Sequence, residues 1–225
     1  MITVKNSMIF SLLVQIITGL ISLHGIFIKL DFNDKILSDI LFLETIVQII
    51  EFLFYVWMTY TFVNIKNLAA RRYMDWVFTT PTMLLSTIMF MKYIEAKKNG
   101  KIIKTMEFFQ TYKKDIISIF ILNFGMLVSG LLGEIKPFLK YISVFIGFGF
   151  FLKTFEIIYK NYASQTNIGS YLFYFMFFVW SLYGVAALLG DKLKNISYNI
   201  LDIFAKNFYG LFLYFFILKT AGYFT

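Results

Sequence analysis

The chain of 225 residues is 59% hydrophobic and 21% aromatic but only 15% charged, whereas about a quarter of the residues of an ordinary soluble domain are charged. This composition excludes a water-soluble globular protein, and the 29 Phe and two Pro exclude disordered and collagen-like chains. With a net charge of +8, no Cys and a single His, His24, the chain offers no disulfide, no thiol chemistry and no His-rich or Cys-ligated metal site.

Seven apolar runs follow one another along the chain. A membrane-spanning helix needs about 20 apolar residues, so a chain of this length accommodates about seven of them with short connections. The runs predict helices at residues 7–28, 38–63, 73–95, 116–133, 137–159, 169–190 and 196–219. We therefore expect an integral, multi-pass membrane protein: an all-α bundle of seven transmembrane helices that forms a single domain over residues 1–225, with the lipid bilayer as its surroundings.

The connection at residues 96–115 is the longest and the most basic. It and its flanks carry Lys92, Lys97, Lys98, Lys101, Lys104, Lys113 and Lys114. Cytoplasmic loops of membrane proteins are enriched in Lys and Arg, so this connection is predicted to be cytoplasmic, the N-terminus extracellular and the C-terminus cytoplasmic. A basic run can also indicate nucleic-acid binding. Lysines beside anionic lipids are the simpler explanation, and no nucleic-acid partner is expected.

A few ionisable residues fall inside the predicted helices. A charge at the centre of a membrane helix costs about 2.5–3.5 kcal/mol on insertion scales, so each such residue is a functional candidate. Lys206 lies near the middle of the seventh helix, and Asp202 precedes it by one turn on the same face. At 100° per residue a polar stripe follows the third helix. The stripe consists of Arg72, Asp75, Thr79 and Ser86.

These charges balance when the lysine is protonated. Arg72 and Lys206 supply two positive charges, and Asp75 and Asp202 supply two negative ones. A neutral Lys206 would leave a buried negative charge uncompensated. Two interpretations remain open at this point: an ion-pair network that only joins two helices, or a lysine that forms an imine with a carbonyl compound.

Three motifs carry a resemblance to a known family. They are RYMDWVFTTP at residues 72–81, WSLYG at 180–184 and DIFAKNFYG at 202–210. In order and spacing they resemble the microbial, type 1 rhodopsins, which are seven-helix proteins that carry retinal on a lysine of helix 7 and are not enzymes. The chain departs from the common family pattern at Gly184, where Pro is frequent, and at Ala187, where Trp is frequent.

The resemblance implies a cofactor and roles for individual residues. Lys206 would hold all-trans retinal covalently as a protonated Schiff base. Asp75 and Asp202 would be its counter-ions, Asp75 also the proton acceptor, and Arg72 would lie beside them. The rings and the hydroxyl expected around the polyene belong to Trp76, Thr80, Trp180 and Tyr183, which agrees with the flat aromatic slot that a long apolar ligand needs.

The third helix also indicates the mode of transport. Its triplet of Asp75, Thr79 and Ser86 looks like the viral branch of the family, some members of which resemble channelrhodopsins in passing cations. An outward proton pump usually has a carboxylic acid at the position of Ser86. Since Ser cannot serve as that acid, a pump would need reprotonation through water or from another carboxylate.

The second helix carries two carboxylates that point to a cation path. Glu44 and Glu51 are seven residues apart, hence on one face and about 10 Å apart in height, an arrangement similar to the helix 2 glutamates of channelrhodopsins. Glu44 is a candidate gate or substitute proton donor. The predicted path or gate comprises Ser11, Gln15, Glu44, Glu51, Thr79, Ser86 and Asn207. An alternative for Ser11 and Gln15 is interhelical hydrogen bonding worth about 0.6 kcal/mol each.

We therefore expect a light-gated cation channel, with an outward proton pump as the alternative and a photosensory receptor as a third class. Relatives suggest a homo-oligomer. The Lys153 and Glu156 pair and the cluster of Asp191, Lys192 and Lys194 are expected to be solvated helix ends.

Overall fold

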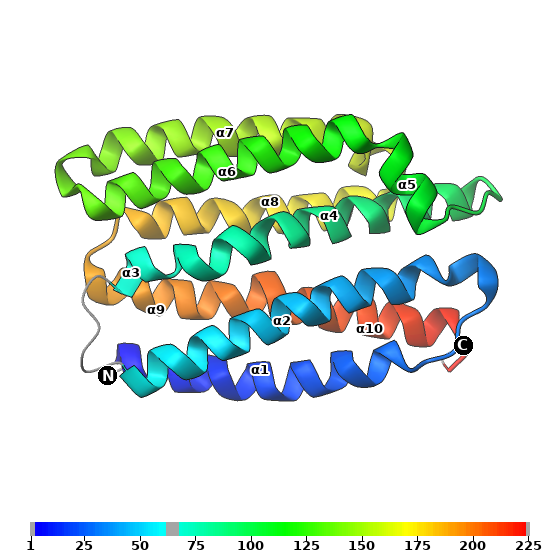
Figure 1. Ribbon diagram of the computed structural model, residues 1–225, viewed down its shortest axis with the longest axis horizontal. Helices are drawn as coiled ribbons and strands as arrows, with labels where there is room; N and C mark the ends of the chain where they lie inside the picture. The colour runs from blue at the N-terminus through cyan, green and yellow to red at the C-terminus, as the bar shows by residue number, and fades with distance from the viewer. Residues whose placement is uncertain (1–2, 62–67, 224–225) are drawn as a thin grey trace.

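The computed structural model describes residues 3–61 and 68–223, and every regular element in these ranges is a helix. Seven helices are long and apolar enough to cross a membrane: Val4–Ile26, Ile36–Thr61, Tyr73–Lys98, Lys113–Ile135, Pro137–Gln165, Asn167–Ala187 and Asp191–Thr220. They run side by side in one bundle, with the N-terminus and the C-terminus at opposite ends (Figure 1). The prediction of an all-α bundle with seven spans is confirmed.

Most spans are single helices. They are α1 (Val4–Ile26), α2 (Ile36–Thr61), α4 (Tyr73–Lys98), α6 (Lys113–Ile135) and α8 (Asn167–Ala187). The fifth span consists of α7 (Lys140–Asn161) between two short 3-10 helices, η3 (Pro137–Leu139) and η4 (Ala163–Gln165). The seventh span consists of α9 (Asp191–Asp202), the π-helical segment η5 (Ile203–Phe208) and α10 (Tyr209–Thr220). Threonines begin two of the helices: Thr3 and Thr166 each accept a hydrogen bond from a backbone N–H of the first turn, at 3.1 and 3.0 Å.

The basic connection at residues 96–115 is largely helical, contrary to its prediction as a loop. The helix α4 continues to Lys98, the short helix α5 covers Thr105–Thr111, and α6 begins at Lys113. Lysines in the last turn of α4 and acids in the first turns of α5 and α6 complement the helix dipoles, which explains why charged residues extend these helices. This connection lies at the same end of the bundle as the C-terminus (Figure 1).

The seventh span begins earlier than expected. It starts at Asp191 rather than at residue 196, with the Asp191 carboxylate in the first turn, where it complements the helix dipole. A second short helix, α3 (Leu68–Arg71), lies in the predicted connection at residues 64–72. Residues 62–63, the predicted end of the second span, lie outside the described ranges.

The predicted exposure of Lys194 is wrong. Its side chain is only 4% exposed and forms ion pairs with Glu134 of α6 at 2.6 Å and with Asp191 at 3.1 Å. Glu134 stands 60 residues away in the sequence, so no local pattern could reveal this partner. Asp191 and Lys192 are exposed, and the Lys153 and Glu156 pair lies at the surface as expected.

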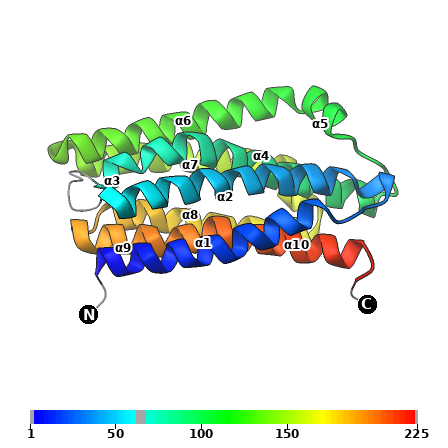
Figure 2. The ribbon, with the colours of Figure 1, turned by 60° about the horizontal axis from the view of Figure 1, so that its bottom comes forward.

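Helix packing brings four polar faces together. The helix α2 packs against α1 and α4, and α1 packs along α9, η5 and α10, as the second view of the ribbon also shows (Figure 2). The most buried spanning helix is α4. The polar residues of α1, α2, α4 and the seventh span therefore share one interior, whereas α6, α7 and α8 close the bundle on its other side.

Candidate functional site

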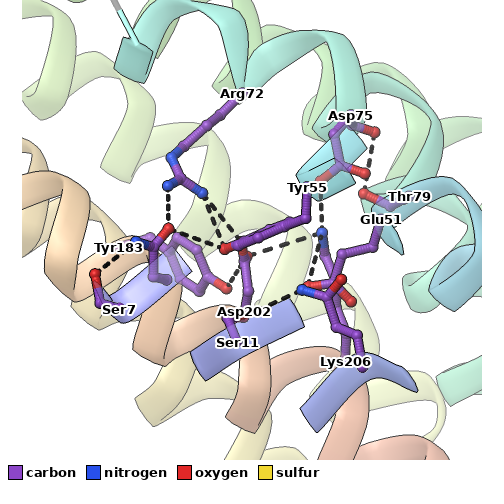
Figure 3. Close-up of polar contacts among 12 residues, drawn as sticks. Ser7, Ser11, Glu51, Tyr55, Arg72, Asp75, Thr79, Tyr183, Asp202 and Lys206 are labelled. Atoms are coloured by element: carbon purple, nitrogen blue, oxygen red, sulfur yellow. Dashed lines mark hydrogen bonds and ion pairs between the residues drawn. The ribbon is translucent and has the colours of Figure 1, made fainter. Parts of the chain in front are cut away.

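Lys206 lies at the centre of the site. It belongs to the π-helical turn η5 and is 2% exposed; such turns often occur at functional positions. Its Nζ is 2.6 Å from Asp75 Oδ2, 3.8 Å from Asp202 Oδ1 and 3.9 Å from Glu51 Oε1 (Figure 3). Three helices thus direct carboxylates at one ammonium group.

A network around Arg72 extends from this lysine toward the N-terminal end of the bundle. Arg72 Nη1 donates to Asp202 Oδ2 at 3.2 Å and to the Tyr55 hydroxyl at 3.1 Å, and Nη2 donates to Asn199 Oδ1. Asp202 also accepts from Tyr55 at 2.6 Å and from Tyr183 at 2.8 Å. Figure 3 shows these side chains converging on Asp202 from different helices. We call Arg72, Tyr55, Asn199, Asp202 and Tyr183 the Arg72 network.

The Arg72 network is continuous with the first helix. Asn199 Nδ2 donates to Ser7 Oγ at 2.8 Å. The Arg72 guanidinium also lies 5.5 Å from the ring centroid of Tyr55 and 5.6 Å from that of Tyr198, within the range of cation–π attraction. The network therefore fixes Asp202 through direct bonds from several helices.

The buried charges require one additional proton. Arg72 and Lys206 contribute two positive charges, against three negative charges if Glu51, Asp75 and Asp202 are all ionised. An uncompensated charge is costly in a fully buried cluster. Glu51 is the carboxyl best suited to hold the proton, because Oε1 has no hydrogen bond and Oε2 only accepts a long one, at 3.4 Å, from Asn207.

The residues of the predicted ion path are all interior. Their exposures range from 0% to 2% for Ser11, Gln15, Glu44, Glu51, Thr79, Ser86 and Asn207. Gln15 Nε2 donates to Ser11 Oγ at 3.1 Å, which is a bond within α1 and not the interhelical bond considered as an alternative. Instead, Thr18 joins α1 to the seventh span by donating to Asn207 Oδ1 at 2.5 Å.

Glu44 and Ser86 meet between α2 and α4, on the C-terminal side of Lys206. Ser86 Oγ donates to Glu44 Oε1 and also lies 2.8 Å from the carbonyl of Met83. A serine hydroxyl has one proton for these two acceptors. Both contacts are satisfied when Glu44 carries a proton of its own, so this pair is a buried site where a proton can be held.

An apolar pocket opens beside Lys206, toward α6, α7 and α8. Its walls include every residue that the motifs assign to a ligand: Trp76, Thr80, Trp180, Tyr183 and Lys206. The Trp76 ring meets the Tyr183 and Tyr198 rings edge-on, at centroid distances of 5.5 and 5.1 Å. The departures from the family pattern, Gly184 and Ala187, also line it. The lining is rich in aromatic rings and contains one amine, that of Lys206.

Several residues of the site were not predicted from the sequence. Tyr55 follows Glu51 by four residues, and Asn199 precedes Asp202 by three, so helical spacing places each on the face of a predicted residue. Asn123 of α6, which donates to Thr80 Oγ1 at 2.8 Å, had no such signal. In the ranges that the structure describes, no cluster of three or more His, Cys, Asp or Glu could hold a metal ion.

Comparisons with known proteins give matches over nearly the whole chain. The model of a family described as bacteriorhodopsin-like proteins matches residues 6–220. The solved structure of the viral rhodopsin OLPVRII is similar over 99% of both chains, with 27% identity and a TM-score of 0.83.

Two more distant structures share the fold. Bromide-bound halorhodopsin from Halobacterium salinarum has 13% identity and a TM-score of 0.76, over 96% of this chain and 93% of that one. The light-driven proton pump of Coccomyxa subellipsoidea has 15% identity and a TM-score of 0.74, over 94% and 96%. No curated protein sequence matches significantly.

Proposed function

Because the chain belongs to the bacteriorhodopsin-like family, whose members are light-driven transporters, channels or sensors and not enzymes, we propose that it is a light-gated cation channel. It is an integral, multi-pass membrane protein, and retinal is the chromophore of its family.

The residues present fit retinal. A long apolar polyene with one aldehyde needs an apolar slot that ends at an amine. The lining of the pocket includes the rings of Trp76, Trp180 and Tyr183, together with Thr80 and Lys206. All-trans retinal, bound to Lys206 Nζ as a protonated Schiff base, would supply light absorption and an isomerisation that displaces the charge at this nitrogen.

The surrounding carboxylates have different roles in this proposal. Asp75, whose Oδ2 is 2.6 Å from Lys206 Nζ, is the nearest counter-ion and the proton acceptor. Asp202 receives hydrogen bonds from Arg72, Tyr55 and Tyr183, so it is a fixed counter-ion whose charge Arg72 balances. A difference in hydrogen bonding thus separates a carboxylate that can take up a proton from one that stays ionised.

The single observation that carries the cation-channel proposal is the row of buried polar residues on both sides of Lys206. Ser11, Gln15, Glu51 and Asn207 lie between α1, α2 and η5, and Glu44 and Ser86 continue the row toward the C-terminal end. Polar and ionisable groups inside a membrane bundle mark ion pathways, because they are too costly to be retained as plain packing. The hydrogen bond from Asn207 to Glu51 is long, at 3.4 Å, and a weak bond is easily broken. We therefore regard this contact as a candidate gate.

An outward proton pump is the second candidate, favoured by one contact. Ser86 stands where a pump usually has its internal acid, and Ser86 is bonded to Glu44. The carboxyl of Glu44 on α2 can therefore act as the proton donor that α4 lacks. Asp75 would accept the proton on the other side of Lys206.

Orientation, assembly and subfamily complete the proposal. The lysine-rich connection and the C-terminus share one end of the bundle (Figure 1), and the positive-inside tendency assigns this end to the cytoplasm. The N-terminus is then extracellular. We assign the chain to the viral branch because of its Asp75, Thr79 and Ser86 triplet and its 27% identity to a viral rhodopsin, and we expect a homo-oligomer as in related proteins.

Voltage clamp under illumination tests the transport mode. The protein is expressed with all-trans retinal, and photocurrents are recorded while the cation gradient is varied. A reversal potential that follows the gradient supports the channel. Outward current without any gradient supports the pump instead, and an illuminated protein without current in either condition contradicts both. Currents that are unchanged in both Glu44→Gln and Glu51→Gln would contradict the proposed path.

A further inference from the structure

A group of buried polar side chains lies between Lys206 and the C-terminal end of the bundle. Ser22 of α1, Glu44 and Gln48 of α2 and Tyr209 of α10 are each between 0% and 2% exposed. We call these four residues the Gln48 cluster. Three of them have no part in the proposed ion path, and Glu44 belongs to both sets.

The Gln48 cluster contains five polar atoms without a protein partner. Within residues 3–61 and 68–223, no hydrogen bond reaches Ser22 Oγ, Glu44 Oε2, Gln48 Nε2, Gln48 Oε1 or the Tyr209 hydroxyl. Buried polar atoms in folded proteins are almost always hydrogen-bonded, and lipid offers no substitute partner in a membrane. Exchanging the O and N of the Gln48 amide changes nothing, because both atoms lack a partner.

Contacts with a glycine bring two members of the cluster together. Gly210 lies where a Cβ atom would collide with the Gln48 amide and would lie 3.3 Å from Ser22 Oγ. The amide and the hydroxyl therefore face the same small region of α10. Glu44 and Tyr209 belong to α2 and α10, which pack against each other.

The mixture of donors and acceptors identifies the ligand. Gln48 Nε2 can only donate, and Gln48 Oε1 can only accept. Glu44 Oε2 accepts while the Glu44 proton lies on Oε1, which contacts Ser86, and the two hydroxyls can do both. A bare cation would satisfy the oxygens but would be repelled by the Gln48 N–H groups. Water both donates and accepts, and buried water typically makes about three hydrogen bonds to otherwise unsatisfied polar groups.

We propose that the Gln48 cluster binds a small group of ordered water molecules, held by Ser22, Gln48, Glu44 and Tyr209. These waters connect α1, α2 and α10 in place of direct side-chain bonds. A second consequence rests on the proposed function: the waters hydrate the part of the ion path between Lys206 and the C-terminal end, so an ion or proton passes the Gln48 amide in a hydrated state.

The first experiment looks for the water directly. A structure of the retinal-loaded protein in lipid, at a resolution that reveals water, should contain density bridging Ser22 Oγ, the Gln48 amide and Glu44. Side chains that bond one another directly, without density between them, would overturn the proposal. Infrared difference spectra in ordinary and ¹⁸O-labelled water give an independent readout, since bands from bound water shift with the isotope and some of them should disappear in Gln48→Leu.

Two variants link the water to transport. Gln48→Leu keeps the approximate volume but removes both polar atoms. We expect the photocurrent to fall about tenfold, the factor that about 1.4 kcal/mol of added barrier produces, while the visible absorption stays in place.

Gly210→Ala should have a similar effect, because the new methyl group displaces the Gln48 amide. Gly149→Ala is the matched control, since a Cβ at Gly149 meets no atom within 4 Å.

The outcomes separate this inference from the proposed function. A wild-type protein with bridging water but no photocurrent would remove the proposed function and leave the water site standing. A wild-type protein with photocurrent but no bridging water would do the reverse. Equal photocurrents in Gln48→Leu, Gly210→Ala and Gly149→Ala would show that the cluster has no part in conduction.

Discussion

Two polar regions lie on opposite sides of Lys206, and they are stabilised in different ways. In the Arg72 network, Asp202 alone accepts hydrogen bonds from three side chains, and Asn199 links Arg72 to Ser7. In the Gln48 cluster, five buried polar atoms have no partner in the part of the chain that the structure describes. Apart from the half-buried Tyr183, the residues of both regions are buried, so burial does not explain the difference.

This difference indicates in which region the polar side chains can rearrange and in which they are fixed. Direct bonds between helices hold charges at set distances and need no reorganisation. A region whose polar groups rely on water can be rearranged at lower cost, since water molecules move more readily than packed side chains. We expect the Arg72 network to determine the stability and colour of the protein, and the Gln48 cluster to determine passage through it.

The largest effect is expected at the boundary between the two regions. Lys206→Ala should abolish the visible absorption band that forms when retinal is added, because no other buried amine faces the pocket in the described residues. Lys219→Ala is the matched control: this exposed lysine ends the same span, and its loss should leave the band intact. A coloured Lys206→Ala protein would contradict the assigned attachment site.

Removal of the cation from the Arg72 network should have the next largest effect. Arg72→Gln leaves Asp202 with Lys206, at 3.8 Å, as its remaining cation, and removing one partner of a buried pair costs about 3–5 kcal/mol. The thermal loss of the visible band measures this cost. The neighbouring Arg71→Gln is the control. Arg71 is exposed and lies 5.7 Å from the Trp57 ring centroid, and its replacement should cost less than that of the buried Arg72, because exposed charged groups contribute less to stability. Equal costs at the two positions would refute the comparison.

A matched pair of tyrosines compares the two regions directly. Tyr183→Phe removes a 2.8 Å hydrogen bond to the Asp202 carboxylate, and hydrogen bonds to charged groups contribute about 1.5–3 kcal/mol. Tyr209→Phe removes a hydroxyl without a protein partner and should cost less, about 1 kcal/mol or below. Chemical or thermal unfolding, followed by the visible band, measures both. A larger cost for Tyr209→Phe would mean that the Gln48 cluster is the more strongly bonded region.

The sequence predicted the charged part of these regions and missed the neutral part. Arg72, Asp75, Asp202 and Lys206 were identifiable because charges are rare in membrane spans, and they stand within motifs. Tyr55 is one of 15 tyrosines in the chain and has no such distinction. Its role depends on Asp202, which lies 147 residues away in the sequence.

Long-range contacts explain what else could not be derived from the sequence. The structure brings Glu51, a residue of the predicted ion path, to 3.9 Å from Lys206, and this approach depends on the rotation of α2 relative to η5, which a single helix does not reveal. Lys194 was expected in solvent because its partner, Glu134, belongs to another span. The seven spans, by contrast, depend only on local hydrophobicity, and they were predicted to within a few residues at most ends.

The smallest effect on the resting protein is expected from Glu44→Gln, which makes it the sharpest test of transport mode. Glutamine keeps the size of the side chain and a contact with Ser86, so the absorption band and its thermal stability should hardly change. If the protein is a pump with Glu44 as the donor, recovery of the dark state should slow by about a hundredfold or more, as expected when a general acid is removed. If it is a channel, the dark state should recover at the wild-type rate, while the amplitude of the photocurrent changes.

Time-resolved absorbance and photocurrent from one preparation distinguish these outcomes. Glu156→Gln is the control, because the exposed carboxylate of Glu156 pairs with Lys153 and Lys160. If Glu156→Gln changed the recovery rate or the photocurrent as much as Glu44→Gln does, neither effect would be specific to the interior.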